Sequence, residues 1–240
     1  MNGAAYNLFL LLGIILAIRF WWNRFQSDDR LTIIFVAAIC GAFIGAKILY
    51  VISEGFLYSG RPDFIRQLLT GKSVLGGLIG GYVAVECAKK LLGYTNSTGD
   101  YFASVVPLSL AIGRLGCLAY GCCLGAECPP DRWYAMIDSQ GVPRWPAVPL
   151  EILFNLAAAG VFFILRQRKM QVGQHFNIYL ISYGAFRFFH EYLRDTPKVF
   201  LALSGYQIAA LFLIVLGAVK YCGTMSTWVA TNAGLNKVTK

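Results

Sequence analysis

Seven long apolar segments constrain the fold of this chain more than any other feature of its sequence. Each holds roughly 18–22 residues, enough for a helix to cross a hydrocarbon core about 30 Å thick. The chain is 57% hydrophobic and only 14% charged, whereas a typical soluble domain has about 25% charged residues. This composition excludes a soluble enzyme, a disordered chain and a DNA-binding domain. We therefore predict an all-α, polytopic membrane protein with seven transmembrane helices. The expected spans are residues 4–22, 31–53, 73–92, 101–122, 148–165, 176–193 and 201–221.

The basic residues favour one side of the predicted membrane. The ends and loops after the odd-numbered spans hold eleven Lys and Arg against three Asp and Glu, and the other side holds seven against eight. Cytoplasmic loops carry the excess of Lys and Arg, so we expect the N-terminus outside and the C-terminus in the cytoplasm. The net charge of +9 then concerns topology and the lipid bilayer. Nucleic acid is not an expected partner, because no loop interleaves a basic run with aromatic residues.

The chain divides into a membrane domain, residues 1–223, and a polar cytoplasmic tail, residues 224–240. The longest outer connection, residues 123–147, is rich in Pro and contains two Trp. We expect it to form a small folded head on the outer face.

Charged residues inside the spans gather in the outer half of the membrane. Chain direction places Lys47, Arg114 and Arg187 there, with Glu151 opening the fifth span on the same side. A charge at this depth is costly unless it is paired or faces water. These residues are either structural ion pairs that hold the bundle together or the walls of a positive cavity for an anionic lipid headgroup.

The sixth span carries the sharpest pattern. Arg187, Glu191 and Arg194 are spaced i, i+4 and i+7, on one face of a helix. His190, beside Glu191, is either a structural histidine at the interface or a base near neutral pH. His175, at the inner end, is expected to be solvated.

Small residues offer two interpretations of the third and fourth spans. Gly76 and Gly77 belong to overlapping small-xxx-small pairs that favour close helix packing. The functional alternative is that bare backbone lets a phosphate or a glycerol approach. Gly113 and Gly116, on either side of Arg114, allow the same.

Cysteines near the outer surface leave their chemistry open. Cys122, Cys123 and Cys128 could close a short disulfide loop in an oxidising compartment. A zinc site is disfavoured, because no His lies near them and three Cys do not complete a closed site. For Cys117, three residues after Arg114, packing is favoured over catalysis. No metal and no cofactor are expected.

Five segments follow the order of motifs in a known enzyme family. Residues 45–51 resemble G-A-R-x-x-Y-V, with Lys47 replacing Arg and Tyr50 at the Tyr. Residues 73–80 resemble S-F-H-G-G-L-I-G, and residues 111–117 resemble A-x-G-R-[IL]-G-N. Arg144 and Glu151 fall on R-[HY]-P-x-Q-x-Y-E, and residues 183–194 closely match Y-G-x-x-R-F-x-x-E-x-x-R. Over residues 5–220 the chain resembles a divergent phosphatidylglycerol–prolipoprotein diacylglyceryl transferase.

The resemblance implies a reaction at the outer leaflet of the bacterial cytoplasmic (inner) membrane. A lipobox cysteine of a preprolipoprotein would attack glycerol C3 of phosphatidylglycerol and release glycerol 1-phosphate. Arg114 and Arg187 would hold the phosphate and Glu191 would orient Arg187, with His190 as a further catalytic candidate. The expected substrate-binding residues are Lys47, Tyr50, Gly76, Gly77, Gly113, Gly116, Arg144, Glu151 and Arg194.

Departures from the family pattern affect the base and the acceptor more than the phosphate. Leu75 stands where the family has a His that is a leading candidate for the base, and Cys117 replaces an Asn. Two alternatives follow. One is a paralogue with the same phospholipid donor and another acceptor, and the other is a non-catalytic phospholipid-binding or transport protein.

Overall fold

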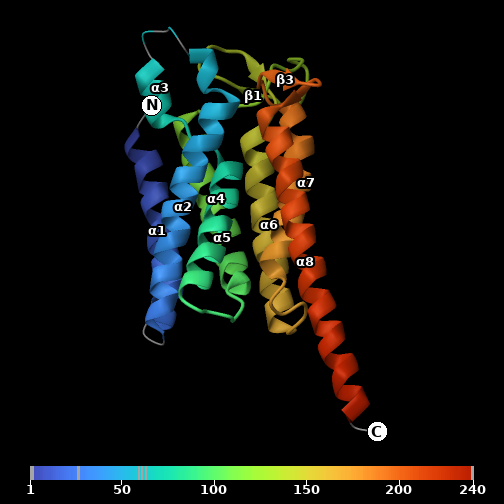
Figure 1. Cartoon of the computed structure of the whole chain (residues 1–240). Coiled ribbons are helices and arrows are strands. Elements are labelled where there is room, and N and C mark those ends of the chain that lie inside the picture. The colour runs from blue at the N-terminus through green and yellow to red at the C-terminus, as the bar shows by residue number, and fades with distance from the viewer. Residues whose placement is uncertain (1–2, 26–27, 59, 61, 63, 239–240) are drawn as a thin grey trace.

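The computed structural model describes residues 3–25, 28–58, 60, 62 and 64–238, and most of them are helical (Figure 1). Short strands and 3₁₀ turns connect the helices at one end. The helices are α1 (Gly3–Phe25), α2 (Asp29–Ser53), α3 (Phe64–Thr70), α4 (Val74–Leu91), α5 (Gly99–Tyr120), α6 (Ala147–Gln167), α7 (His175–His190) and α8 (Gly205–Val238). The 3₁₀ turns are η1 (Gly55–Tyr58) and η2 (Glu191–Leu193), and the strands are β1 (Met136–Ile137), β2 (Pro143–Arg144), β3 (Lys198–Phe200) and β4 (Leu203–Ser204).

A long helix lies in each of the seven predicted segments, and successive long helices run in opposite directions (Figure 1). The end that carries α3 and the four strands is called the head end below. Within residues 123–147, β1 pairs antiparallel with β2 at this end, and Met136 lies opposite Arg144. Helix α3 and the β3–β4 hairpin were not predicted, since both are too short for a periodic pattern to show.

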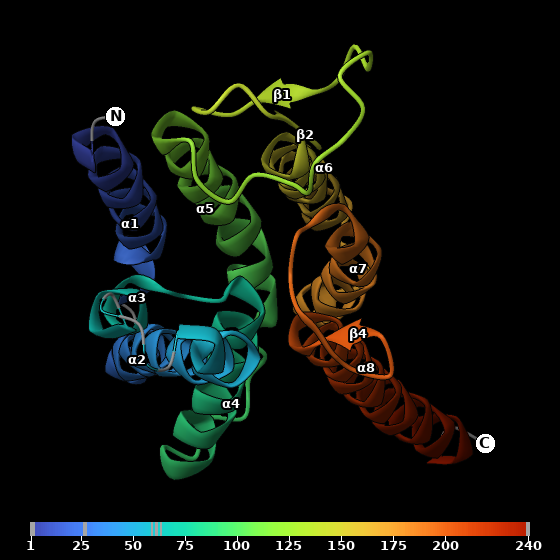
Figure 2. The ribbon, with the colours of Figure 1, turned by 90° about the horizontal axis from the view of Figure 1, so that it is seen from above.

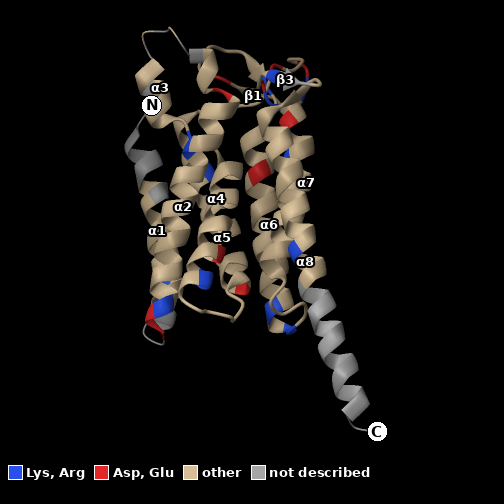
Figure 3. Ribbon diagram, viewed as in Figure 1, with Lys and Arg blue, Asp and Glu red and all other residues tan. Residues whose placement is uncertain are grey.

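The distribution of apolar and charged side chains is that of a membrane protein. Within the described residues, four helical segments are long and apolar enough to cross a bilayer: α2, α5, α6 and Gly205–Gly223 of α8. Large apolar side chains cover their outward faces, with Ile52 69% and Leu153 65% exposed. Charged residues gather towards the two ends of the bundle (Figure 3). The chain is therefore a multi-pass helical membrane protein.

The seven long helices pack mainly as neighbouring pairs (Figure 2). Helix α2 packs along α4, α7 along α8, and α5 between α1 and α6. The α2–α4 contact is backbone to backbone: a Cβ built on Gly45 would lie 2.3 Å from the carbonyl oxygen of Gly76. A Cβ on Gly80 would lie 2.3 Å from the carbonyl oxygen of Gly41. Only glycine permits this approach, which is the physical reason for the small-residue pattern.

Aromatic rings fill the core between the helices. Trp21 is fully buried, with its ring centroid 5.1 Å from that of Phe35 and 5.0 Å from that of Phe102. Phe176 and Tyr179 of α7 continue this packing, 5.9 Å apart. Residues from α1, α2, α5 and α7 therefore share one apolar core.

Two sequence expectations about α7 require correction. His175 is not solvated: it is 1% exposed, and its Nε2 lies 2.8 Å from the carbonyl oxygen of Met170. Asp100 accepts the backbone N–H of His175 and so pulls this residue inward at the start of α7. At the other end, α7 stops at His190 and becomes the 3₁₀ turn η2, after which Arg194 is extended. Arg194 thus does not share one regular helical face with Arg187.

Candidate active site

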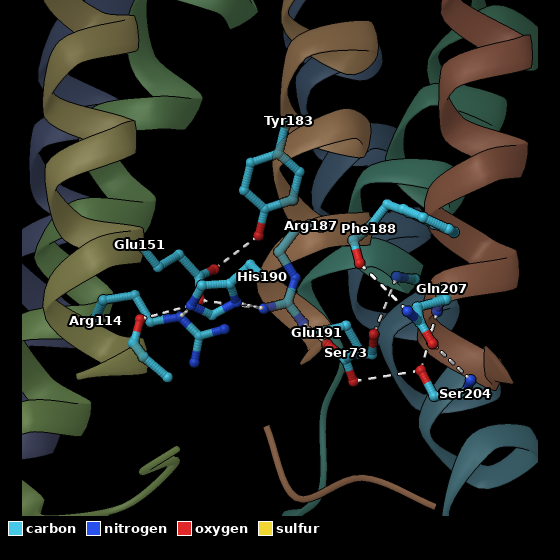
Figure 4. A network of polar contacts seen from close by, with 12 residues as sticks. Ser73, Arg114, Glu151, Tyr183, Arg187, Phe188, His190, Glu191, Ser204 and Gln207 are labelled. Carbon is cyan, nitrogen blue, oxygen red and sulfur yellow. Dashed lines mark hydrogen bonds and ion pairs between the residues drawn. The ribbon is translucent and has the colours of Figure 1, made fainter. Parts of the chain in front are cut away.

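A buried polar network lies near the head end, where α5 and α7 finish and α6 and α8 begin (Figure 4). Its centre is Glu151, which is fully buried in the first turns of α6. Arg114 Nε lies 2.9 Å from Glu151 Oε2, and Arg187 Nη1 lies 3.7 Å from the same oxygen. The Tyr183 hydroxyl donates to Glu151 Oε1 at 2.7 Å. Two arginines from different helices therefore converge on one buried carboxylate.

Arg187 is fixed by a second carboxylate, that of Glu191 in the η2 turn directly after α7. Its Nη2 donates to Glu191 Oε2 at 2.9 Å, across the i,i+4 spacing that the sequence showed. Glu191 is fully buried, and the Ser204 hydroxyl lies 3.5 Å from its Oε1. A buried arginine is stable only with such partners, because an unpaired charge in the interior is expensive.

Ser204 and Gln207 form a capping box that starts α8 beside this pair. The backbone N–H of Gln207 donates to Ser204 Oγ at 3.2 Å, and the backbone N–H of Ser204 donates to Gln207 Oε1 at 2.9 Å. Two backbone donors at the helix start are thereby satisfied reciprocally. Gln207 Nε2 also donates to the Phe188 carbonyl at 3.4 Å, which joins the start of α8 to the last turn of α7.

His190 is engaged through both ring nitrogens. Arg187 Nη1 lies 2.7 Å from Nδ1, and the Ala147 carbonyl oxygen lies 2.8 Å from Nε2. A guanidinium only donates and a carbonyl only accepts, so the matching tautomer carries its proton on Nε2. The Nδ1 lone pair then accepts from Arg187, and the ring links the start of α6 to Arg187. This geometry favours a positioning role for His190 over that of a base.

Arg194 has spare donors. Its Nε and Nη1 are buried and have no hydrogen-bond partner among the described residues. It lies within electrostatic reach of His190 and of Cys123. Glu151 pairs with Arg114, and Glu191 with Arg187. Glu54 lies within electrostatic reach of Arg194 and forms no ion pair with it among the described residues. Unsatisfied guanidinium donors in such a place suit an anion.

Two of the predicted substrate-binding residues lie on α2, away from the network. Lys47 Nζ donates to the carbonyl oxygen of Leu68 at 2.8 Å and also to that of Leu69. These carbonyls belong to the last turn of α3, where a cation is favourable. Tyr50 is buried, and its ring fills the space where Gly71 has no side chain. Both residues thus position the loop that precedes α4.

Arg144 lies in the head, where it pairs with acids. Its Nε is 3.0 Å from Asp138 Oδ2, and its Nη2 is 3.8 Å from Glu127 Oε1. Asp138 also accepts the backbone N–H groups of Gln140 and Val142. These three bonds hold the pKa of Asp138 below its usual value, with the Val142 N–H as the largest cause. The structure gives Arg144 a part in closing the β1–β2 hairpin.

The four predicted glycines separate into different environments. Gly76 faces Gly45, and a Cβ on it would lie 2.2 Å from the Gly45 carbonyl oxygen. Gly77 is in ordinary contact with α2, at 3.5 Å from the Ala42 carbonyl oxygen. Gly116 is buried in α5, whereas a Cβ on Gly113 would meet nothing within 4 Å. Gly113 therefore borders open space.

Tyr183 and Ser204 belong to the network but were not among the predicted site residues. Tyr183 is fully buried and stands four residues before Arg187, so the helical repeat places both on one face of α7. Ser204 was detectable from the Ser-x-x-Gln spacing that precedes the last apolar segment.

A cluster of three thiols lies next to Arg114. The Sγ atoms of Cys117, Cys122 and Cys123 all lie within 4.8 Å of one another. Arg114 Nη1 lies 3.9 Å from Cys117 Sγ. All seven cysteines are free thiols, so the disulfide considered for Cys122, Cys123 and Cys128 is not formed. In the sequence, Cys128 was the expected third partner of Cys122 and Cys123. In the fold, Cys117 is the thiol that lies beside these two.

Taken together, the fold and the site define a polytopic membrane protein with buried, carboxylate-held arginines at one end of its helix bundle. A family model described as "Prolipoprotein diacylglyceryl transferase" matches residues 3–222. The chain belongs to this family of transferases.

Relatives of known name cover most of the chain. Phosphatidylglycerol–prolipoprotein diacylglyceryl transferase 2 of Clostridium perfringens is 28% identical over 232 residues, which are 90% of this chain and 89% of the relative. The transferase of the same type from Streptococcus uberis is 31% identical over 229 residues, 89% of this chain and 88% of the relative. The one from Vibrio vulnificus is 34% identical over 194 residues, 77% of this chain and 68% of the relative.

Proposed function

We propose that the chain transfers the diacylglyceryl group of phosphatidylglycerol to the lipobox cysteine of a preprolipoprotein, at the network around Glu151. The relatives' names give the donor and the prolipoprotein acceptor. The observation that carries the placement is the convergence of Arg114 and Arg187 on one buried carboxylate. Two arginines held in this way cannot swing apart, so they present a fixed cationic surface to a phosphate.

The reaction needs a thiolate and a stabilised leaving group. The acceptor thiolate attacks C3 of the glycerol that carries the two acyl chains. A C–S bond forms there, and the bond from C3 to the phosphate oxygen breaks. The electron pair leaves with the oxygen, so the products are a thioether and glycerol 1-phosphate. Negative charge develops on the phosphate, and cations held in advance at that position lower the barrier.

Arg194 extends this anion site. Its two buried, unpartnered guanidinium nitrogens can donate to phosphate oxygens without breaking an existing hydrogen bond. Glu191 and His190 act on Arg187 from the side, as positioning residues. Gly113, the residue before Arg114 in the chain, borders open space in which a glycerol backbone can lie.

The loop charges and the direction of the helices support an orientation for the proposed site. We infer seven transmembrane helices, with the N-terminus outside and the head end at the outer leaflet of the bacterial inner membrane. An alkaline phosphatase fused after residue 140 should be active, and a fluorescent protein fused at the C-terminus should fold and fluoresce. The opposite pair of results would place the network at the inner leaflet and overturn this orientation.

One experiment separates the proposed reaction from its alternatives. Purified protein in phosphatidylglycerol vesicles is mixed with a lipobox peptide, and glycerol phosphate and the mass of the peptide are measured. Release of glycerol phosphate with a matching mass gain on a Cys peptide, and no gain on its Ser counterpart, supports the proposal. Lipid turnover without peptide modification identifies the paralogue with another acceptor, for which Leu75 at the family's His position is the motivating observation. If neither glycerol phosphate nor a modified peptide forms, the chain is a phospholipid-binding protein without this activity.

A further inference from the structure

The thiol group at the end of α5 is produced by the way this helix terminates. Gly121 adopts a left-handed conformation with φ 73°, and its N–H bonds to the Leu118 carbonyl at 3.1 Å. The N–H of Cys122 reaches back to the Cys117 carbonyl, also at 3.1 Å. This pair of bonds is a Schellman motif, which folds the chain back over the last helical turn. It brings Cys122 beside Cys117 although they are five positions apart.

The next residue turns in the same sense. Cys123 has φ 61°, a left-handed conformation that is uncommon for a residue with a side chain. The consequence is that its Sγ joins the other two, and all three sulfur atoms lie within 4.8 Å of one another. Strained backbone of this kind concentrates at ligand and catalytic sites, where it places a side chain that relaxed backbone would point elsewhere.

We propose that Cys117, Cys122 and Cys123 bind a single zinc ion and leave its fourth position for the thiol of the acceptor cysteine. This inference rests on the proposed function, because it assigns to the zinc the activation of the acceptor. Three thiolates at Zn–S distances of about 2.3 Å would stand about 3.8 Å apart, so each pair of sulfur atoms needs to approach by at most about 1 Å. Structural zinc sites have four protein ligands, whereas catalytic ones have three and an open position.

The surroundings leave that fourth position accessible and charge-compensated. Cys117 is buried, but Cys122 and Cys123 are only half-buried, so the cluster is open on one side. Three thiolates and one Zn²⁺ carry a net charge of −1. Arg114, whose Nη1 lies 3.9 Å from Cys117 Sγ, supplies a neighbouring positive charge. The same Arg114 is held by Glu151, so the bound acceptor would lie next to the arginine that receives the phosphate.

A bound zinc ion would remove the need for a side-chain base at the family's His position, which is Leu75 here. Leu75 is 1% exposed and apolar, and His190 already uses both ring nitrogens, so neither offers a free base for the acceptor. A thiol that coordinates zinc loses its proton to solvent on binding. The zinc-bound sulfur then forms the C–S bond to glycerol C3, the electron pair of the breaking C3–O bond leaves with the phosphate, and the thioether product dissociates as a weak ligand.

The test of the site uses zinc and cobalt as probes and does not depend on activity. Reduced, chelator-treated protein should bind one equivalent of Zn²⁺ in competition with a chromophoric chelator. Bound Co²⁺ should show the ultraviolet charge-transfer absorption of thiolate ligands. Replacing any of the three by serine (Cys117→Ser, Cys122→Ser, Cys123→Ser) should weaken zinc binding at least tenfold. Cys128→Ser is the matched control, because Cys128 is a buried thiol of the same segment that lies outside the cluster, and it should bind as the wild type does.

The fourth position is tested by adding peptide to the cobalt-loaded protein. A lipobox peptide should increase the thiolate absorption, and its Cys→Ser counterpart should not. The proposal is overturned if no zinc binds, if the three serine variants bind as tightly as Cys128→Ser, if the peptide thiol leaves the cobalt spectrum unchanged, or if two of the three thiols are isolated as a disulfide.

Activity separates this inference from the proposed function. Zinc binding and peptide ligation without lipid transfer would refute the proposed function and leave the metal site standing. Full transfer by chelated, metal-free protein would refute the role of zinc and leave the proposed function standing.

Discussion

Individual residues in the network differ in how far the sequence could predict them. The Arg187–Glu191 pair was predictable, because i,i+4 neighbours on a helix meet whatever the tertiary structure. The contacts of Glu151 with Arg114 and Arg187 were not, since they join three helices and no spacing encodes them. The motif resemblance did include Glu151, without saying what it touches. His175 was misplaced because a polar residue near a helix start is usually solvated, and here Asp100 draws it inward.

Arg114→Ala and Arg187→Ala should each reduce transfer by about 10²–10³-fold, by analogy with the loss of one donor to a developing negative charge. Each change removes a cation from the phosphate site and also leaves Glu151 with one buried partner fewer. The measurement is glycerol phosphate release at saturating phosphatidylglycerol. Arg132→Ala is the control, because Arg132 is exposed in the head. Full activity in either network variant, with normal expression, would refute the proposed site.

His190→Asn and His190→Leu distinguish a positioning residue from a base. Asparagine can still accept a hydrogen bond from Arg187, and leucine cannot, so we expect His190→Asn to keep more activity than His190→Leu. The pH dependence of the rate should be the same in wild type and His190→Asn. A base would behave differently: both variants would lose about 10²–10⁴-fold, and a limb near pH 6–7 would disappear from the profile.

Whole elements were easier to predict than their ends. Apolar length predicted a helix in each of the seven segments, and the structure has one there. Among the described residues, four of these helices are long and apolar enough to cross a bilayer. The stop of α7 at His190 was missed: the apolar pattern continues through Leu193, while the chain tightens to a 3₁₀ turn there. The backbone of α2 and α4 meets at glycine, as small-xxx-small spacing favours.

Gly76→Ala should destabilise the α2–α4 contact by about 1–3 kcal/mol, the usual cost of overpacking. The new Cβ would lie 2.2 Å from a backbone oxygen of Gly45, and two packed helices cannot yield locally. The measurement is thermal unfolding in detergent. Gly77→Ala is the neighbouring control, since its Cβ would make a 3.5 Å contact. Equal melting temperatures for the two variants would contradict a backbone-to-backbone contact.

Asp138 should stabilise the β1–β2 hairpin only while it is ionised. Its pKa is lower in the folded chain than the unfolded value of about 3.9, so its contribution is complete above that value. The contribution is lost as the pH falls through the folded pKa. Asp138→Asn should therefore speed hydrogen exchange of residues 136–144 at pH 7. Asp131→Asn, an exposed acid of the same loop, should not. The difference between wild type and Asp138→Asn should vanish in strong acid.

At the scale of the molecule, the sequence predicted a helical membrane protein. The structure shows which helices pack together to form the site. The family match ends at residue 222, and the network draws on α5, α6, α7 and the first turn of α8. The sequence could set the number of long helices, but only packing shows that the site lies between two helix ends and two helix starts.

Removal of residues 224–240 should leave the melting temperature and the transfer rate unchanged. These residues form the predicted polar tail, beyond the membrane domain of residues 1–223. Thermal unfolding and peptide lipidation of the shortened chain are the measurements. A lost fold or a lost rate would show that the membrane domain extends past residue 223.

The glycine contact between α2 and α4 also bears on how the chain enters the membrane during synthesis. These are successive long helices, separated by residues 54–73, and both are synthesised before α5. Their backbones meet without help from the aromatic core, which needs residues of α5 and α7. We expect them to insert as an antiparallel hairpin that forms early, with the later helices assembling against it.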